Sequence, residues 1–401
     1  MTYKMMDGNL AAVEAMKMAK VQVVSAYPIT PQSNIAEKLS DLVASGELKA
    51  EYIRVESEHS ALSVATTAQL AGVRAATATA SNGLALMHEV LGMTSGNRVP
   101  IVMPVVNRGV AAPWTLWCEH GDAMAERDMG WMQFYCENVQ EVFDLILMAY
   151  KAAEDKDVLT PAMVCLDGFF LSHSMQKIVV PKQELVDNFI GGYKSQNTYL
   201  DTEDPMFICD LTGSEEYTEM KYQQKLAMDN AIGVIEQVQR EFEEKFGRKY
   251  SIVEGYRTED ADVVLVALGS MCGTGKHVVN KLREKGKKVG LAKVTVFRPF
   301  PAEKIREILS GTRCIGVFDR SAGIGGQGGP VWSEVCAAMK DISCDIRNYT
   351  GGLGGRDVSP DNIEKIFDEL LEISQGKRKN HTAWIDLKEN AMDIRQVIKN
   401  V

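Results

Sequence analysis

Apolar positions in the first 165 residues recur with two spacings. Short runs in which most residues are apolar, at 21–25 and 100–106, are typical of strands buried in a parallel sheet. Longer segments at 9–19 and 58–70 repeat apolar residues every three or four positions, as helices with one buried face do. Strands that alternate with helices of this length predict a parallel sheet covered by helices on both faces.

The same alternation continues to residue 166. The predicted helices are 9–19, 35–43, 58–70, 84–94 and 139–153, and the predicted strands are 21–25, 50–55, 74–79, 100–106 and 162–166. Residues 175–220 are rich in proline, glycine and mixed charge, which predicts an extended connection across the surface. A charged helical pattern over 220–246 follows and predicts a linker helix.

A second alternating block begins near residue 262. Its predicted strands are 263–268, 288–296, 313–318 and 343–349, and its predicted helices are 275–285, 302–309, 330–339 and 360–373. The expected fold is therefore α/β, with two doubly wound parallel-sheet domains. We place the first domain at 1–175, the connection and linker helix at 176–255, the second domain at 256–376 and a C-terminal tail at 377–401.

Composition narrows the class of protein. A chain of 401 residues with 45% hydrophobic and 24% charged residues is ordinary for a globular protein of two domains. No apolar run approaches the roughly 18 residues of a membrane span, and the first residues show no signal-peptide core. We therefore expect a cytoplasmic protein with no membrane partner. A net charge of −10 also argues against a nucleic-acid partner.

None of the eight cysteines forms a C-x-x-C pair. Zinc and iron–sulfur sites usually take ligands from such spacings, so we expect neither a structural metal nor a cluster in this chain. Several cysteines, such as Cys165 and Cys314, lie in apolar runs and are expected to be small buried hydrophobic residues.

Polar residues follow several predicted strands, at the edge where open α/β sheets bind ligands. After the strand at 21–25, Pro28 and Pro31 bracket Thr30 and restrict the backbone on both sides of its hydroxyl. The segment is therefore either a rigid strand-to-helix turn or a ligand-binding loop.

Asn107-Arg108 follows the strand at 100–106 and places a guanidinium at the same edge. This group binds carboxylates through two parallel hydrogen bonds. The alternative for Arg108 is a structural ion pair at a strand end. Trp114 and Trp117 lie just beyond and either wall a pocket or belong to the core.

Glu56 and Glu58 lie at the start of an apolar helix, directly after a strand. One of them is expected to cap the helix, where a carboxylate favours the macrodipole. Because the helix is apolar, Glu58 is alternatively expected to point inward, where it suits proton exchange with a ring nitrogen. His59 is expected to be a hydrogen-bonded core histidine.

Residues 323–328 match the pattern G-x-G-x-x-G between a strand and a helix, which suggests a dinucleotide site. The match lies in a glycine run that satisfies many patterns by chance. A similar run at 351–355 predicts a mobile or tightly turning loop with a structural role or a subunit contact.

Seven motifs follow one another in order along nearly the whole chain. They are Tyr-Pro-Ile-Thr-Pro at 27–31, Val-Glu-Ser-Glu-His-Ser-Ala at 55–61, Thr-Ala-Ser-Asn-Gly-Leu-Ala-Leu-Met-His-Glu at 79–89, Asn-Arg at 107–108, Arg-Asp-x-Gly-Trp at 127–131, Leu-Asp-Gly-Phe at 166–169 and Phe-Arg-Pro-Phe-Pro at 297–301. Together they resemble the α subunit of 2-oxoacid:ferredoxin oxidoreductases. Within that family they are most similar to the enzyme that acts on pyruvate.

The resemblance implies a thiamine diphosphate enzyme that oxidises pyruvate with coenzyme A to acetyl-CoA and CO₂ and passes electrons to ferredoxin. This chain would supply the pyrimidine-binding domain and a domain similar to the transketolase C-terminal domain. Partner subunits of β, γ and δ type would hold the diphosphate with Mg²⁺ and the [4Fe–4S] clusters.

By the same resemblance, Glu58 hydrogen-bonds the aminopyrimidine, Pro28 and Ile29 belong to the cofactor-binding loop, and this chain contributes no metal ligand. Thr30 and Arg108 bind the substrate carboxylate and are counted with Glu58 as catalytic.

Residues 114–122 depart from the family pattern and add bulk near Arg108, which bears on substrate size. Thr30 favours a substrate with one carboxylate, so pyruvate, 2-oxobutyrate and branched-chain 2-oxoacids stay open. Two other classes also stay open: a nicotinamide-dependent oxidoreductase that uses the loop at 323–328, and a non-catalytic scaffold subunit.

Overall fold

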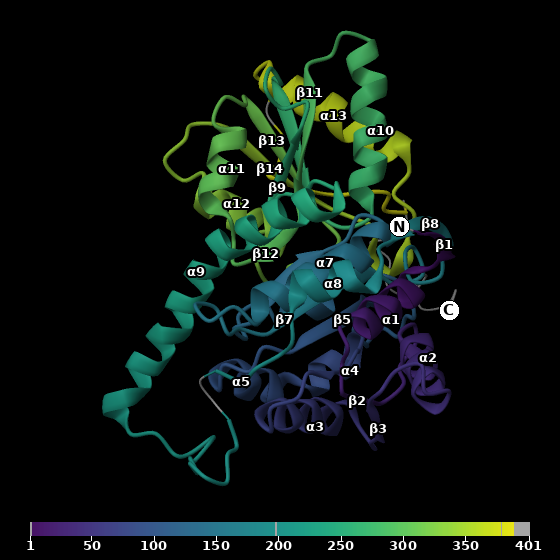
Figure 1. Ribbon diagram of the computed structural model, residues 1–401. Coiled ribbons are helices and arrows are strands. Elements are labelled where there is room, and N and C mark those ends of the chain that lie inside the picture. The colour runs from purple at the N-terminus through teal and green to yellow at the C-terminus, as the bar shows by residue number, and fades with distance from the viewer. Residues whose placement is uncertain (1, 197–198, 378, 389–401) are drawn as a thin grey trace.

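The computed structural model, which describes residues 2–196, 199–377 and 379–388, contains two α/β units (Figure 1). The strands of the first unit's sheet are β2 (Val23–Ala26), β3 (Glu51–Arg54), β4 (Ala75–Ala76), β5 (Val102–Asn107), β6 (Met132–Tyr135), β7 (Ala162–Asp167) and β12 (Val296–Arg298). They run in the order β3-β2-β4 and β5-β7-β6-β12, and a bridge between Thr79 and Val105 joins the two groups. Every pairing is parallel except that of β12 with β6.

Helices cover both faces of this sheet. One face carries α1 (Gly8–Met18), α2 (Ser33–Ala44) and α7 (Val139–Ala153), and the other carries α3 (Glu58–Leu70), α4 (Ser81–Leu86), α5 (His88–Gly96) and α6 (Gly121–Ala125). Strand β5 is apolar on both of its faces because each face packs against a different helix layer. Val102 and Val106 pack on the side of α1, α2 and α7, whereas Met103 and Val105 pack on the side of α3–α6.

The second unit has a sheet of six strands in the order β15-β14-β13-β10-β11-β9. The strands are β9 (Val253–Tyr256), β10 (Val263–Ala267), β11 (Val289–Val294), β13 (Cys314–Asp319), β14 (Asp345–Thr350) and β15 (Thr382–Trp384), and only β9 is antiparallel to its neighbour. The helices are α10 (Met271–Glu284), α11 (Ala302–Leu309), α12 (Pro330–Ala338) and α13 (Pro360–Ser374), with a short 3-10 helix η1 (Leu353–Gly355). The predicted fold class, two parallel-sheet α/β domains, is confirmed.

One strand prediction is wrong, and the strand that forms instead joins the two units. The strand expected at 288–296 ends at Val294, and Val296–Arg298 forms β12, which pairs with β6 of the first sheet. One continuous core then runs between the units, with Trp131 and Tyr135 from the first and Phe297 at the junction. The two units are therefore held together by a shared strand and shared apolar packing.

The extended connection predicted at 175–220 is also wrong in part. Strand β8 (Gln176–Val180) pairs antiparallel with β1 (Thr2–Met6), and helix α8 (Gln183–Ile190) follows it. Helix α8 forms because Val186 and Phe189 give it a buried face, and the Phe189 ring meets Phe242 of helix α9 (Ser214–Phe246) edge-on at 5.4 Å. No helix among the described residues combines the length and the apolarity that crossing a bilayer requires.

In the last predicted segment, 377–401, residues 382–384 form β15 beside β14. Residues 389–401 lie outside the described residues.

Candidate functional site

Glu58 begins α3 at the carboxyl edge of the first sheet. It is 7% exposed, and Ser57 is the helix cap, because its hydroxyl accepts from the Ser60 amide at 3.2 Å. The prediction that a glutamate caps this helix is therefore wrong. No group of the described residues donates a hydrogen bond to the Glu58 carboxylate. A shielded acid that receives no hydrogen bond from the described residues is available to a bound ligand.

Helix α4 packs directly against this carboxylate because position 83 is glycine. A Cβ on Gly83 would lie 2.7 Å from Glu58 Oε1 and 2.6 Å from Thr79 Oγ1, so a larger residue would collide with both. The Thr79 hydroxyl is buried and has no hydrogen-bond partner in the described part of the chain. Sequence reasoning placed Gly83 and Thr79 in a motif but did not identify them as neighbours of Glu58.

Arg108 follows β5 and lies within electrostatic reach of Glu58. Its Nη1 donates to the Thr30 carbonyl at 2.6 Å, and its guanidinium carbon lies 5.9 Å from the centre of the Trp114 ring. Burial lowers the pKa of Arg108, against the opposing effect of the Asp122 and Glu58 carboxylates. Its Nε is buried without a partner among the described residues. Arg108 Nε is thus still able to donate a hydrogen bond to a ligand. The Arg108 side chain forms no ion pair with any of the described residues.

The loop after β2 holds the other predicted site residues. Asn9 Nδ2 fixes the loop by donating to the Pro31 carbonyl at 2.9 Å. Ile29 is half-buried and packs against the core, whereas Pro28 and Thr30 are exposed at the surface. The structure brings Arg108 to the backbone of Thr30 and leaves the Thr30 side chain facing solvent.

Asp122 is a site residue that sequence reasoning missed. Its Oδ2 accepts from the backbone amides of Arg108 at 3.0 Å and Ser81 at 2.9 Å, and its Oδ1 accepts from Asn107 Nδ2 at 2.8 Å. Burial raises the pKa of this carboxyl, while these donors act in the opposite direction. Asp122 therefore fastens the end of β5 to the start of α4. The only sequence signal was its position in the divergent segment 114–122.

Two further predictions at this edge need correction. His59 is half-exposed, with its Nε2 3.4 Å from a Glu89 carboxylate oxygen, so it is not a core histidine. Trp114 and Trp117 are 76% and 52% exposed, so the core alternative is wrong for both. The site edge is therefore an open surface with exposed aromatic rings.

A buried polar cluster beside the edge joins the two units. Asp167, the last residue of β7, accepts from His120 Nε2 at 2.7 Å, from Arg320 Nη1 at 2.6 Å and from the Ser270 hydroxyl. Burial acts to raise the pKa of Asp167, but His120 and Arg320 outweigh it and lower that pKa. Cys118, His120 and Asp167 offer three possible metal ligands within 4.8 Å of one another, yet Arg320 Nη1 lies 3.6 Å from Cys118 Sγ and supplies the positive charge there.

The glycine loop at 323–328 lies between β13 and α12. The Asp319 carboxylate accepts from the amides of Val331 at 2.8 Å and Trp332 at 3.2 Å, the first amides of that helix. A dinucleotide pyrophosphate would need the same amides. The protein's own carboxylate therefore fills the position that a nicotinamide cofactor would use.

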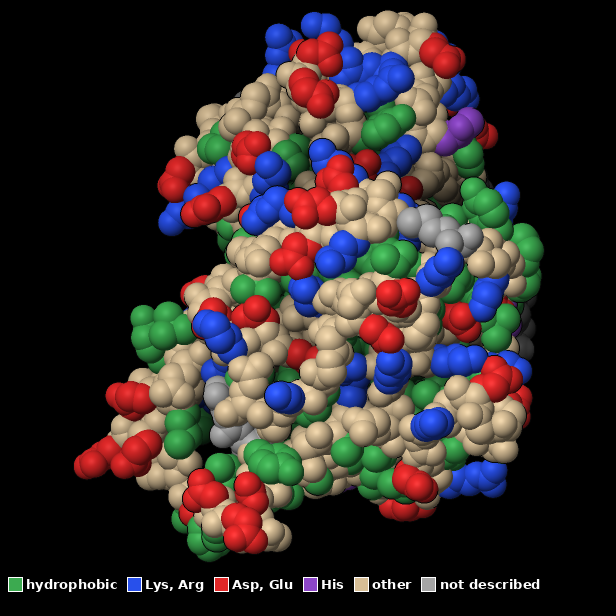
Figure 2. Space-filling view, in the orientation of Figure 1, with side chains coloured by type: hydrophobic (Ala, Val, Ile, Leu, Met, Phe, Trp, Pro, Cys, Tyr) green, Lys and Arg blue, Asp and Glu red, His purple; other side chains and the backbone are tan. Residues whose placement is uncertain are grey.

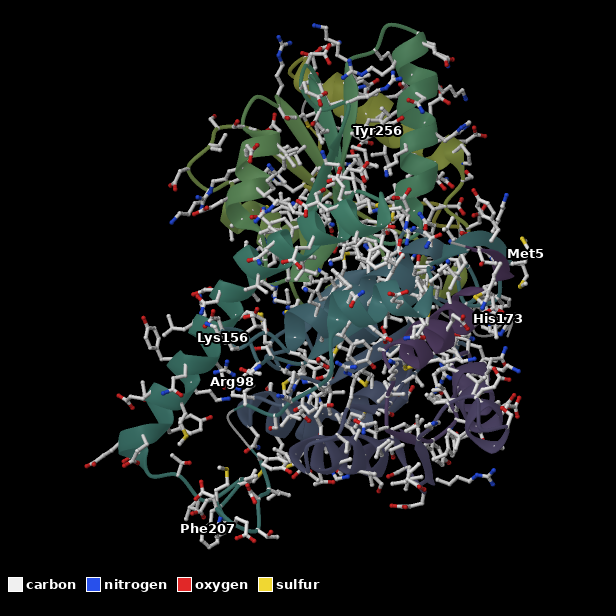
Figure 3. The ribbon with its side chains drawn as sticks, in the orientation of Figure 1. Met5, Arg98, Lys156, His173, Phe207 and Tyr256 are labelled. Carbon is white, nitrogen blue, oxygen red and sulfur yellow. The ribbon has the colours of Figure 1, made fainter. Side chains whose placement is uncertain are left out.

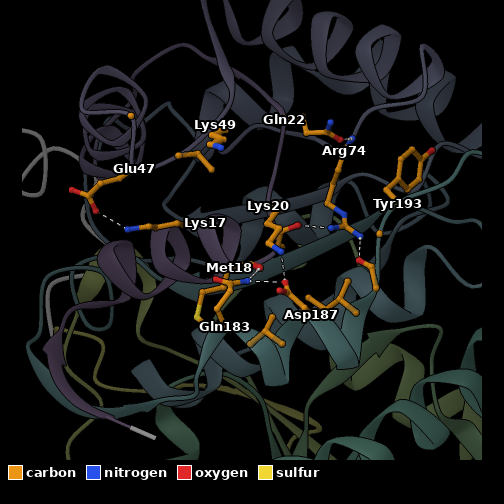
Figure 4. A pocket seen from close by; sticks show the side chains of 17 residues that line it. Lys17, Met18, Lys20, Gln22, Glu47, Lys49, Arg74, Gln183, Asp187 and Tyr193 are labelled. Atoms are coloured by element: carbon orange, nitrogen blue, oxygen red, sulfur yellow. Dashed lines mark hydrogen bonds and ion pairs between the residues drawn. The ribbon is translucent and has the colours of Figure 1, made fainter.

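A cavity of about 760 Å³ lies at the opposite, amino edge of the first sheet (Figure 4). Lys17 pairs there with Glu47 and Lys20 pairs with Asp187, each at 2.7 Å. These lysines are neutralised within the chain, and the cavity lies where the strands begin, away from the edge at which α/β sheets bind ligands.

The chain matches two family models and a set of curated relatives. The family model described as pyruvate flavodoxin/ferredoxin oxidoreductase, thiamine diphosphate-binding, matches residues 14–240, and the pyruvate:ferredoxin oxidoreductase core domain II model matches residues 261–363. The chain is 46% identical to pyruvate synthase subunit PorA of Methanothermobacter thermautotrophicus, over 98% of this chain and 100% of the relative. It is 44% identical to ketoisovalerate oxidoreductase subunit VorA of Pyrococcus abyssi, over 96% and 98%.

Two solved structures share the fold. A 2-oxoglutarate:ferredoxin oxidoreductase from Magnetococcus marinus, solved with 2-oxoglutarate, coenzyme A and succinyl-CoA bound, has a TM-score of 0.69 and 20% identity, over 92% of this chain and 65% of that one. A split gene transketolase has a TM-score of 0.54 and 13% identity, over 92% and 99%.

Fold, edge geometry and family models together define an α/β protein of the thiamine-diphosphate-binding class. Within that class, the chain belongs to the pyruvate:ferredoxin oxidoreductase family. The family expected from the seven motifs is thereby confirmed.

Proposed function

We propose that this chain is the α subunit of a pyruvate:ferredoxin oxidoreductase that uses thiamine diphosphate. The reaction is the oxidative decarboxylation of pyruvate with coenzyme A to acetyl-CoA and CO₂, and ferredoxin accepts the electrons. One observation carries the proposal: Glu58, a shielded glutamate with no hydrogen-bond donor in the described part of the chain, lies within electrostatic reach of Arg108 at the carboxyl edge of the first sheet.

The residues of this edge fit an aminopyrimidine. Glu58 is free to share a proton with the ring nitrogen, and Gly83 lets α4 approach without covering that carboxylate. Bound thiamine diphosphate supplies the carbon that adds to the 2-oxo group and accepts the electron pair released with CO₂. Pro28 and Ile29 shape the loop beside the ring. They contribute placement rather than proton transfer.

Arg108 binds the substrate carboxylate in this proposal. Its Nε is buried and unpartnered among the described residues, and Nη1 is already fixed on the Thr30 carbonyl, so the guanidinium plane is oriented before substrate arrives. The hydroxyl of the exposed Thr30, whose carbonyl accepts from Arg108, donates a hydrogen bond to the same carboxylate. Together they align the bond that breaks.

The open edge supports a shared site. Because Thr30, Trp114 and Trp117 are exposed, a neighbouring chain has room to cover the cofactor. We assign the diphosphate and Mg²⁺ to a β-type subunit and the [4Fe–4S] clusters to the β, γ or δ-type subunits, all in the cytoplasm. Coenzyme A enters as co-substrate.

A branched-chain 2-oxoacid is the second candidate substrate. A relative named for ketoisovalerate is 44% identical, against 46% for one named for pyruvate, so identity does not separate them. Trp114 favours the smaller acid in this proposal because its ring, 5.9 Å from the Arg108 guanidinium carbon, takes up space beside the proposed carboxylate site.

The test is to purify the complex from its native host and to assay reduction of a viologen dye with pyruvate, 2-oxobutyrate and 2-oxoisovalerate, each with coenzyme A. We expect bound thiamine diphosphate and iron, and the highest kcat/KM with pyruvate. A preference for 2-oxoisovalerate would reassign the substrate. Bound nicotinamide without thiamine would overturn the proposal.

A further inference from the structure

Residues 199–226 form an arm that projects from the body of the first unit (Figure 1). The arm consists of the loop before α9 and the first three turns of that helix. None of the α9 residues before Ala227 is buried, whereas the rest of the helix packs a regular stripe into the core. Figure 3 shows Phe207 at the far end of the arm. This part of α9 is thus largely exposed to solvent, and only Gln224 is half-buried, where its Nε2 donates to the Ser95 hydroxyl at 3.5 Å.

The arm carries a concentration of exposed apolar side chains. Phe207 and Leu211 are 92% and 95% exposed. Seven more large apolar residues of the arm are exposed: Tyr199, Leu200, Met206, Tyr217, Met220, Tyr222 and Leu226. Figure 2 shows hydrophobic and acidic side chains interleaved on this projection. Apolar groups gathered in this way mark a surface that another molecule covers.

The charge of the outer part of the arm, residues 199–219, is of one sign, and the two lysines of the arm, Lys221 and Lys225, lie closer to the body. Between residues 199 and 219 there are seven acidic residues and no lysine or arginine: Asp201, Glu203, Asp204, Asp210, Glu215, Glu216 and Glu219. Such a segment repels nucleic acids and anionic lipid. A second copy of this chain, with net charge −10, is also a poor partner for it. The charge selects a partner with a basic surface.

The loop of the arm contacts the body at Leu200 and at Cys209, and the first of these contacts lies away from the candidate site. The Leu200 amide donates to the Leu70 carbonyl at 2.9 Å, and Asn97 Nδ2 lies 2.9 Å from Cys209 Sγ. Leu70 is the last residue of α3, and Glu58 is the first. A helix of 13 residues spans about 20 Å, so contacts made by the arm do not reach the Glu58 carboxylate.

We propose that the arm docks another subunit of the same complex, one that presents an apolar groove bordered by lysine and arginine. Phe207 and Leu211 fill the groove, and the carboxylates of the arm pair with its border. The proposal needs only that the chain works as a subunit, as its family relatives are named, and it is independent of the substrate.

The first experiment co-expresses the full chain with the other subunits of its complex and compares subunit composition by native mass spectrometry. The double variant Phe207→Asp/Leu211→Asp is expected to bind one subunit about tenfold more weakly or to lose it. The matched control is Ile324→Asp, an 86% exposed apolar residue in the second unit, which is expected to assemble like the wild type. Equal thermal unfolding of the variant chains shows that both are folded. Wild-type assembly by the double variant would overturn the proposal.

The second experiment identifies the partner without any substitution. A carbodiimide joins carboxylates to lysines in contact, and we expect cross-links in the wild-type complex from Asp210, Glu215 or Glu219 to lysines of one different subunit. Cross-links to a second copy of this chain, or none from the arm, would overturn the proposal. A complex that shows the expected cross-links but does not oxidise pyruvate would count against the proposed function alone.

Discussion

The carboxyl edges of the two sheets treat their polar groups differently. In the first sheet, Glu58 has no donor and Arg108 Nε no acceptor among the described residues. In the second, Asp319 at the end of β13 accepts from the Val331 amide and from Asn348 Nδ2, each at 2.8 Å. Buried polar groups are normally satisfied within the protein, so unpartnered ones mark a place for a ligand. We therefore expect the first edge to bind a ligand, whereas at the second edge Asp319 holds a helix to a strand.

This difference separates two motifs that look equally suggestive in the sequence. The glycine pattern at 323–328 matches a dinucleotide site in letters, but Asp319 already occupies the first amides of α12. The motif at 55–61 has no such competitor at Glu58. A motif therefore indicates a site only when the structure leaves its polar groups free.

The largest effect is expected at Glu58. Glu58→Gln keeps the shape of the side chain but removes the exchangeable proton, so kcat in viologen reduction with pyruvate should fall by about a hundredfold or more, with the complex still assembled. The control is Glu56→Gln, an exposed neighbour whose carboxylate accepts a hydrogen bond from the Ser60 hydroxyl. Full activity of Glu58→Gln in an intact complex would support the scaffold alternative.

The next effect is expected at Arg108. Arg108→Lys keeps the charge but loses the planar fork, so kcat/KM for pyruvate should fall about ten- to a hundredfold, mainly through KM. Arg54→Lys is the matched control, because Arg54 is an exposed residue that ends a strand of the same sheet. An unchanged kcat/KM in the Arg108 variant would remove this arginine from the substrate site.

A smaller effect is expected at Asp122, which accepts from the Arg108 amide and, in the proposed site, positions Arg108. Asp122→Asn replaces one acceptor oxygen with a donor group that faces backbone amides, so KM for pyruvate should rise about tenfold with a smaller change in kcat. Asp128→Asn, on an exposed carboxylate, should change neither parameter. If Asp122→Asn lowers both the melting temperature and kcat but leaves KM unchanged, the role of Asp122 is purely structural.

Local patterns predicted the parts of the fold that depend on local residues. Helix α3 has the predicted bounds, because its apolar spacing and its N-terminal polar residues lie within one segment. Strand β12 was not predicted as a separate element, because its change of sheet depends on pairing with Phe134, far away in the chain. The predicted helix 84–94 is instead interrupted at Met87, between α4 and α5.

The candidate site divides in the same way. Glu58 and Arg108 could be predicted as candidates because Arg108 directly follows a strand and Glu58 opens the helix after one, at positions that the sequence shows. Asp122 bonds to the amide of Ser81, 41 residues earlier, and Gly83 matters only because Glu58 lies against it. Such contacts between distant segments have no local signal, so they needed the structure.

The smallest effect tests the second edge through pH. Burial raises the pKa of Asp319 to about 7, against the hydrogen bonds from Val331, Trp332 and Asn348, whereas the unfolded chain has an ordinary aspartate. Between about pH 4 and pH 7 the folded state keeps a proton that the unfolded state releases, so this group's contribution to stability falls as pH rises, by up to about 1.4 kcal/mol per pH unit. Asp319→Asn does not titrate and loses one acceptor at all pH values.

The melting temperature of Asp319→Asn should therefore lie furthest below that of the wild type near pH 5, and the gap should narrow towards pH 8. The control is Asp341→Asn, at an exposed position. The melting temperature of the full chain with this substitution should show no such trend. A gap that is constant from pH 5 to pH 8 would mean that Asp319 is already ionised throughout. The second edge would then hold a stable negative charge at the N-terminus of α12. The two edges would differ only in whether their polar groups have hydrogen-bond partners within the protein.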